Sequence, residues 1–242
     1  DGFKEELAAP QLQTFRVVAM EEHGRRYPQA GGVVVLMANE VVGSFRLDGE
    51  VFEIAPVGNA GLHATYRLSD SKLESNFSCA AEDLAENQAR QKRQPGTRTV
   101  ANPVVECVEV ALDIDHHTYN TFGGSCSSAV DWALALLAGV HEIYVDELNN
   151  LVSLQASYVH VWEVTDPYAA YVQNAGSMLD AFRSEWVSNP ALSGVDRDLA
   201  HLLTRRTNTG TGGIAYLDVV CSNQFAVGFS SYLSGTTSYT GG

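Results

Sequence analysis

VECVEVALDID, from Val105 to Asp115, is the stretch that decides the fold class of this chain. It is mostly apolar and has the length of a strand that is buried on both faces. Apolar residues then recur at helical spacing from Ser125 to Asn149, and LVSLQASYVHVWEV, Leu151 to Val164, alternates as a strand does. Strand, helix and strand in this order predict a right-handed crossover and a largely parallel sheet.

The alternation continues downstream. SMLDAFRSEWV (177–187) predicts an amphipathic helix, while DLAHLL (198–203) and FAVGFSSYL (225–233) predict two further strands. The sequence therefore predicts an α/β domain over residues 104–242, with helices packed on the sheet. Three tryptophans occupy apolar positions in it, which favours core packing over ligand stacking: Trp132, Trp162 and Trp186.

Residues 12–68 predict a different unit, built from short strands and turns. In VVGSFRLDGEVFEIAPVG (41–58), the Asp48-Gly49 pair is a strong signal for a two-residue hairpin. We expect a small antiparallel β region over residues 1–79.

Residues 80–103 between the two units are polar and charged, with little apolar periodicity, and predict an exposed linker. Arg90, Lys92 and Arg93 form a compact basic cluster within it. A solvated run of charge is the simpler interpretation. The functional interpretation is a processing site, since proteases of trypsin-like and furin-like specificity cut such clusters in exposed segments.

Composition restricts the partners. The 242 residues are 45% hydrophobic and carry a formal charge of −14, with a pI near 4.8. This balance argues against nucleic acid, because phosphate binding needs clustered Lys and Arg. No run of eighteen apolar residues occurs, so no membrane segment is predicted. We expect a secreted or extracellular protein; the four cysteines fit either redox compartment.

GVHEIYVDEL, Gly139 to Leu148, contains the first two residues of the zinc-protease signature H-E-x-x-H. The signature needs two histidines four apart on one helix face, and here the second position is Val145. Since the surrounding apolar residues have helical spacing, we interpret His141 as a boundary residue of an ordinary helix and not as a metal ligand.

Other candidate motifs also have simpler interpretations. GGSCSS (123–128) lies at a helix start, where a capping role is favoured. The glycines of TGTGG (209–213) lack the context of a dinucleotide loop. His116 and His117 are expected on a strand, where adjacent side chains point to opposite faces and cannot share one metal.

The ordered set of segments is more informative than any single one. In sequence they are IDHHTY, EIYVDELN, VHVWEVTDPY, LDAFRSEW, RDLAHLLTRR, GGIAYLDVVC and FAVGFSSYL. In this order they resemble the upper catalytic subdomain of reprolysin-like (adamalysin-type) metzincin zinc peptidases, over about Val104 to Leu233. The resemblance implies a twisted, mostly parallel sheet with an antiparallel edge strand, and the preceding β unit resembles a prodomain.

In that family the zinc motif H-E-x-x-H-x-x-G-x-x-H follows the strand that FAVGFSSYL resembles. The chain ends at Gly242 without it, so the zinc ligands and the catalytic glutamate are expected beyond this residue, and the chain alone is expected to be inactive. The resemblance places the edge strand of the cleft at Phe225–Leu233. An extended peptide pairing with it by strand addition would contact Ala226, Val227, Gly228 and Phe229.

Further roles are implied by the resemblance alone. Glu109 and Asp198 align with structural calcium positions of some reprolysins, although calcium takes about six to eight oxygen ligands. Cys79 is a candidate thiolate ligand that would bind the catalytic zinc and keep the enzyme latent. The alternative is a structural cysteine. Cys221 resembles a cysteine that pairs beyond this chain, which would leave Cys107 and Cys126 as a candidate disulfide.

We therefore expect a fragment of a secreted zinc-dependent endopeptidase precursor, which acts on a protein or peptide substrate and carries an intramolecular prodomain. The alternative is a secreted interaction module without catalysis that retains the upper subdomain. A zinc helix encoded downstream would separate the two.

Overall fold

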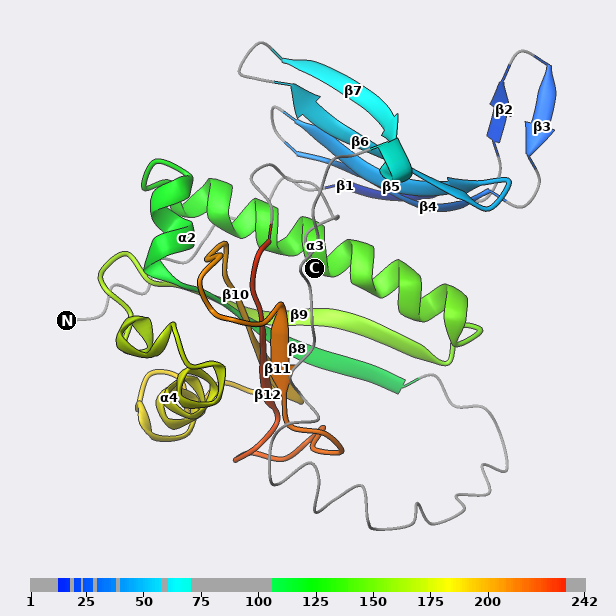
Figure 1. Ribbon diagram of the computed structural model, residues 1–242. Helices are drawn as coiled ribbons and strands as arrows, with labels where there is room; N and C mark the ends of the chain where they lie inside the picture. The colour runs from blue at the N-terminus through cyan, green and yellow to red at the C-terminus, as the bar shows by residue number, and fades with distance from the viewer. Residues whose placement is uncertain are drawn as a thin grey trace, which may run out of the picture.

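The computed structural model describes residues 13–17, 20–22, 24–27, 30–37, 40–57, 61–70 and 106–233. Two five-stranded sheets lie on opposite sides of one long helix, α3 (Cys126–Glu147), as Figure 1 shows. The molecule is thus a mixed α/β fold in which a single helix contacts both sheets.

The N-terminal sheet is antiparallel throughout, in the order β1-β4-β5-β6-β7. Its strands are β1 (Gln13–Val17), β4 (Gly31–Leu36), β5 (Val41–Leu47), β6 (Glu50–Val57) and β7 (Leu62–Arg67). The short strands β2 (Met20–Glu22) and β3 (Arg25–Tyr27) pair with each other, and a 3-10 turn, η1 (Leu68–Asp70), follows β7. The expected hairpin is confirmed: Asp48 and Gly49 have φ of 50° and 85°, and Leu47 pairs with Glu50.

The second sheet has the order β11-β12-β10-β8-β9. Its strands are β8 (Glu106–Ile114), β9 (Val152–Val161), β10 (Leu199–Leu203), β11 (Gly213–Ala215) and β12 (Val227–Ser230). All neighbours pair in parallel except β11, which is antiparallel to β12. The carboxyl ends of four strands therefore meet at one edge of the sheet.

Helices cover both faces of this sheet. The side chains of β8 alternate between them, so that Ala111 packs against α4 (Ala175–Ser188) while Leu112 packs against α3. Around Ala111 the helix contributes Met178, Leu179, Phe182 and Trp186. Around Leu112, α3 contributes Ala129, Trp132, Ala133 and Leu136. Two shorter helical segments, α2 (His116–Thr121) and η3 (Ala169–Tyr171), complete the second unit.

Helix α3 also has a second buried face. Ala135 packs against Val33, Val35 and Val42 of the N-terminal sheet. By length and composition alone, α3 is the one described helix that could cross a membrane, a property that core helices share. In this fold its buried residues contact the sheets on either side.

The two residues of the His-Glu pair of α3 contact other parts of the chain. The ring Nδ1 of His141 accepts a hydrogen bond from the Leu154 backbone N–H at 3.0 Å. Glu142 forms an ion pair with Arg16 at 3.2 Å. The predicted apolar stripe is buried only in the first half of the helix. In the second half Val140, Ile143 and Tyr144 are exposed, whereas Val145, which lies outside that stripe, is buried.

The expected strand position of His116 and His117 is wrong. The two histidines begin α2 and do not continue β8, because the Asp115 carboxylate accepts from the Thr118 backbone N–H at 2.8 Å and caps the helix. Nδ1 of His116 lies 3.2 Å from the Trp162 carbonyl oxygen. The capping role predicted for GGSCSS (123–128) is confirmed: the Ser125 hydroxyl accepts from the Ser128 N–H at the start of α3.

Candidate functional site

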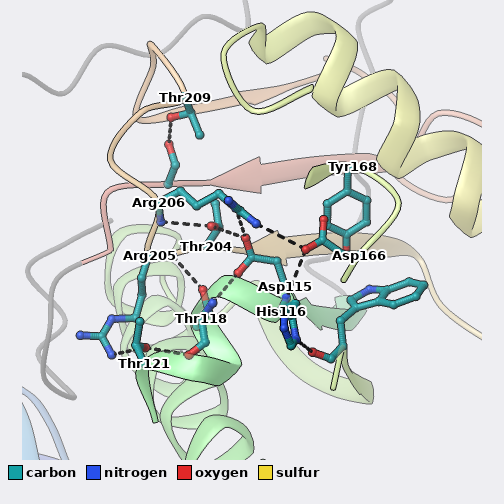
Figure 2. A network of polar contacts seen from close by, with 12 residues as sticks. Asp115, His116, Thr118, Thr121, Asp166, Tyr168, Thr204, Arg205, Arg206 and Thr209 are labelled. Atoms are coloured by element: carbon teal, nitrogen blue, oxygen red, sulfur yellow. Dashed lines mark hydrogen bonds and ion pairs between the residues drawn. The ribbon is translucent and has the colours of Figure 1, made fainter. Parts of the chain in front are cut away.

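A buried polar network lies where the parallel strands end (Figure 2). Its centre is Asp115, the residue after β8, whose side chain is fully buried. One carboxylate oxygen caps α2 through Thr118. The other accepts from the Thr204 hydroxyl and from Nε of Arg206, both at 2.7 Å. Asp115 thus joins the ends of β8 and β10 to the start of α2.

Asp166 brings the segment after β9 into the same network. Its Oδ2 lies 3.5 Å from the Arg206 guanidinium and accepts from the His116 backbone N–H at 3.3 Å. Its Oδ1 is buried and has no hydrogen-bond partner among the residues that the structure describes. Burial and the nearby Asp115 carboxylate raise the pKa of Asp166, and the Arg206 charge opposes that rise. One partly buried arginine thus lies beside two buried carboxylates.

The neighbouring arginine makes different contacts. The Arg205 backbone N–H donates to the Thr118 hydroxyl at 2.9 Å, and its guanidinium donates to Thr121 at 2.7 Å. The same guanidinium lies 5.1 Å from the ring centroid of Phe122. Arg205 therefore holds the end of β10 against α2. None of these contacts involves the carboxylates of Asp115 or Asp166.

The network also holds the chain as it leaves β12. The hydroxyls of Thr209 and Ser231 lie 2.8 Å apart, and both residues are buried. The Tyr232 backbone N–H donates to the Arg206 carbonyl at 2.9 Å. The position of residues 231–233 is therefore fixed by the loop that follows β10.

A second buried carboxylate, Asp113, lies on the α4 face of β8. Oδ1 accepts from the Trp162 indole at 3.0 Å and from the Tyr168 hydroxyl, and Oδ2 accepts from the Trp186 indole at 2.9 Å. Burial raises the pKa of Asp113 to about 8, although these three hydrogen bonds oppose the rise. Trp162 and Trp186 thus pack in the core, as predicted, and both also donate a hydrogen bond to the buried Asp113 carboxylate.

The placement of Ala226, Val227, Gly228 and Phe229 at the edge of the sheet is wrong. Strand β12 is parallel to β10 on one side and antiparallel to β11 on the other, so both its edges are paired. All four residues are buried. The error has a physical cause: GGIAY contributes a three-residue strand, too short and glycine-rich to give an alternating pattern, and this strand is outermost.

Glu109 and Asp198 do lie together. Asp198 Oδ2 accepts from the Glu109 backbone N–H at 2.8 Å, and Oδ1 accepts from the Cys221 thiol at 3.1 Å. Both oxygens of this carboxylate are thus used by the chain itself. No group of three or more His, Cys, Asp or Glu side chains suited to a metal occurs among the described residues, so the calcium expectation gains no support.

The remaining predicted residues have mixed outcomes. Cys79 and the basic cluster Arg90, Lys92 and Arg93 lie outside the described residues. The candidate disulfide between Cys107 and Cys126 is wrong, because Cys107 of β8 and Cys126 of α3 lie beside opposite ends of β9. Cys107 is in register with Ser153, whereas the Cys126 thiol donates to Glu163 at 2.8 Å. Ten residues of extended chain separate these contacts by roughly 30 Å, and a disulfide needs Cα atoms within about 7 Å.

Sequence reasoning did not identify the residues of the network. Asp115 carried the one usable signal, an aspartate directly after a buried strand and three residues before a threonine, which is a typical helix N-cap position. Asp166, Thr204 and Arg206 come from other segments, and their convergence depends on the order of the strands.

Residues 106–240 match the family model Reprolysin_5, metallo-peptidase family M12. A search of curated proteins found no match. Among solved structures, the crystal structure of metalloproteinase-II from Bacteroides fragilis is similar over 93% of this chain and 71% of that chain, with 13% identity and a TM-score of 0.45. That likeness is too weak to carry an argument about function. The family match spans more than half of the 242 residues, and the chain therefore belongs to metallopeptidase family M12.

Proposed function

We propose that this chain is part of the precursor of a secreted, zinc-dependent endopeptidase. The observation that carries the proposal is the M12 family match over residues 106–240, a region that includes the whole of the second sheet with α3 and α4. The strongly acidic composition, with a formal charge of −14, supports the proposal of a secreted protein. The N-terminal sheet would be a prodomain, and the segment containing residues 90–93 would be the site of processing.

The described residues of this chain do not fit a catalytic zinc. Three of the described histidines make separate contacts: Nδ1 of His116 lies near a carbonyl, Nδ1 of His141 accepts from a backbone N–H, and Nε2 of His201 lies 3.0 Å from the Ser230 hydroxyl. No third metal-binding group joins any of them within the described ranges. These residues therefore have no catalytic role in the proposal, and the zinc ligands of the complete enzyme would lie outside them.

What the chain itself would contribute is a scaffold. The network around Asp115 and Arg206 fixes the carboxyl ends of the parallel strands and the exit of the chain from β12. Ligands of open parallel sheets bind at this edge. An extended peptide that adds to the sheet can do so only at an outermost strand, which is β11 or β9 and not β12.

The test compares this chain with the same chain extended through the residues that its gene encodes after Gly242. We expect the extended protein to bind one zinc per molecule and to hydrolyse casein, with both properties lost after removal of the metal by a chelator. We expect the 242-residue chain to do neither. Stoichiometric zinc and hydrolysis by the 242-residue chain would contradict our placement of the ligands. An extended protein without zinc or hydrolysis would favour the alternative, a non-catalytic interaction module.

A further inference from the structure

The outer face of α3 has the character of a protein–protein interface. Val33 and Val35 of β4 and Val42 of β5 are almost completely buried where they meet Ala135 of the helix. Met37 and Ala138 pack at the margin of this cluster. Valines on a sheet thus face alanines on a helix, and the small alanine side chains let the two backbones approach closely.

Charge continues the same helix face toward the C-terminus of α3. Ala135, Ala138, Glu142 and Asp146 follow one another at intervals of three and four residues, which places them on one side of the helix. Arg16 of β1 lies 3.2 Å from the Glu142 carboxylate and 4.0 Å from that of Asp146. An apolar contact flanked by an ion pair fixes both the position and the direction of the sheet on the helix.

The register of the N-terminal sheet explains why these groups act together. Arg16 pairs with Val33 across β1 and β4, so both side chains project from the same face of the sheet. Val35 and Val42 are paired across β4 and β5 and lie on that face too. The face that docks on α3 is therefore a continuous surface of the antiparallel sheet, formed by residues of β1, β4 and β5.

The sheet docks away from the candidate site. In Figure 1 the N-terminal sheet lies on one side of α3, and β8 and β9 lie on the other. The network of Asp115 and Arg206 is at the carboxyl edge of the second sheet. The described contacts of the N-terminal sheet are thus with the side of α3 that faces away from β8 and β9.

We propose that this face of α3 is a binding surface for the N-terminal sheet as a separable partner, and that residues 13–67 stay bound to residues 106–233 after the chain between them is cut. The binding itself requires no peptidase activity. Its biological use, a processed protein that keeps its N-terminal part, rests on the proposed function. A failure to find zinc or hydrolysis would leave the binding experiment unaffected.

The experiment uses the full chain with residues 90–93 replaced by the recognition sequence of a site-specific protease. After complete cleavage, the protein is loaded on a gel-filtration column at several micromolar concentrations. We expect the two parts to elute together under native conditions and separately in urea. Separate elution under native conditions would overturn the proposal.

A charge exchange tests whether the α3 face is the surface that binds. In the cut protein, Arg16→Glu and Glu142→Arg should each raise the dissociation constant by about tenfold, because each places like charges together. The double variant should return it to within about threefold of the original. Arg67→Glu reverses an ion pair with Glu50 on the same sheet and is the matched control, with no effect expected. Equal effects of Arg16→Glu and Arg67→Glu, or no recovery in the double variant, would contradict the proposed surface.

Discussion

Replacing Arg206 by methionine is the sharpest test of the buried network. The change removes the guanidinium that lies 2.7 Å from Asp115 and 3.5 Å from Asp166, and it keeps a flexible apolar side chain of comparable length. Both carboxylates are almost completely buried, with exposed fractions of 0% and 2%. They would remain inside the protein without the cation that offsets their charge.

The expected loss in free energy of unfolding is about 3 kcal/mol at pH 7.5. Removing one partner of a buried ion pair costs about 3–5 kcal/mol, because the other charge stays buried and uncompensated. The lower end applies here, since Thr118 and Thr204 still donate hydrogen bonds to Asp115. Asp166 retains its bond from the His116 N–H.

The loss should shrink at acidic pH. Burial already raises the pKa of Asp166, and losing Arg206 raises it further. A carboxyl group with a raised pKa in the folded state destabilises the protein as pH rises from its unfolded pKa toward its folded pKa. At pH 5 a larger fraction of Asp166 is protonated in the variant, so the penalty for burying its charge is smaller than at pH 7.5.

The measurement is urea unfolding followed by tryptophan fluorescence. All three tryptophans lie after residue 106, so the signal reports on the second unit and not on the N-terminal sheet. Arg205→Met is the matched control and should cost less than about 1 kcal/mol, because its guanidinium bonds a hydroxyl and lies over a ring. Equal losses in the two variants, or a loss at Arg206 that grows toward pH 5, would refute the reasoning.

Two further changes test other parts of the fold. Burial raises the pKa of Asp113 from 3.8 to about 8. The free energy of unfolding of the wild type should therefore fall as pH rises through that window, by up to ~1.4 kcal/mol per pH unit. Asp113→Asn should lack this slope when urea unfolding is measured between pH 5 and 8. An unchanged slope would contradict the assignment. Gly32→Ala should destabilise the N-terminal sheet by about 2–3 kcal/mol, since its Cβ would lie 2.2 Å from the Ser44 carbonyl oxygen at a φ of +149°. Gly31→Ala, with open space around its Cβ, should be nearly neutral when both are measured by hydrogen exchange of the sheet amides.

Local sequence signals predicted most of the elements. The Asp48-Gly49 turn, the buried strand before Asp115 and the two long helices each depend on residues within one segment, and each is present. The elements that were missed are the shortest ones. Helix α2 has six residues and β11 has three, so neither is long enough to give a clear periodic pattern.

The order of strands was a harder problem, and it caused the error at Phe225–Leu233. A sequence pattern states that a segment is a strand but not which neighbours it has. The two outermost strands of the second sheet, β9 and β11, contain apolar residues as the central strands do, so composition does not distinguish them. The pairing of β12 with β10 and β11 depends on contacts between segments that are distant in sequence.

The side to which each arginine points, in contrast, follows from alternation once the strands are placed. On β10, Leu202 faces α4 and Leu203 faces α3. Continuing this period of two past the end of the strand puts Arg205 on the α3 side, where Phe122 and Thr121 lie, and Arg206 on the α4 side. On β8, Ala111 faces α4, so the same rule puts Asp115 on the α4 side as well. Arg206 and not Arg205 therefore meets the buried carboxylate, because parity along two neighbouring parallel strands decides which of two adjacent, chemically identical side chains becomes its partner.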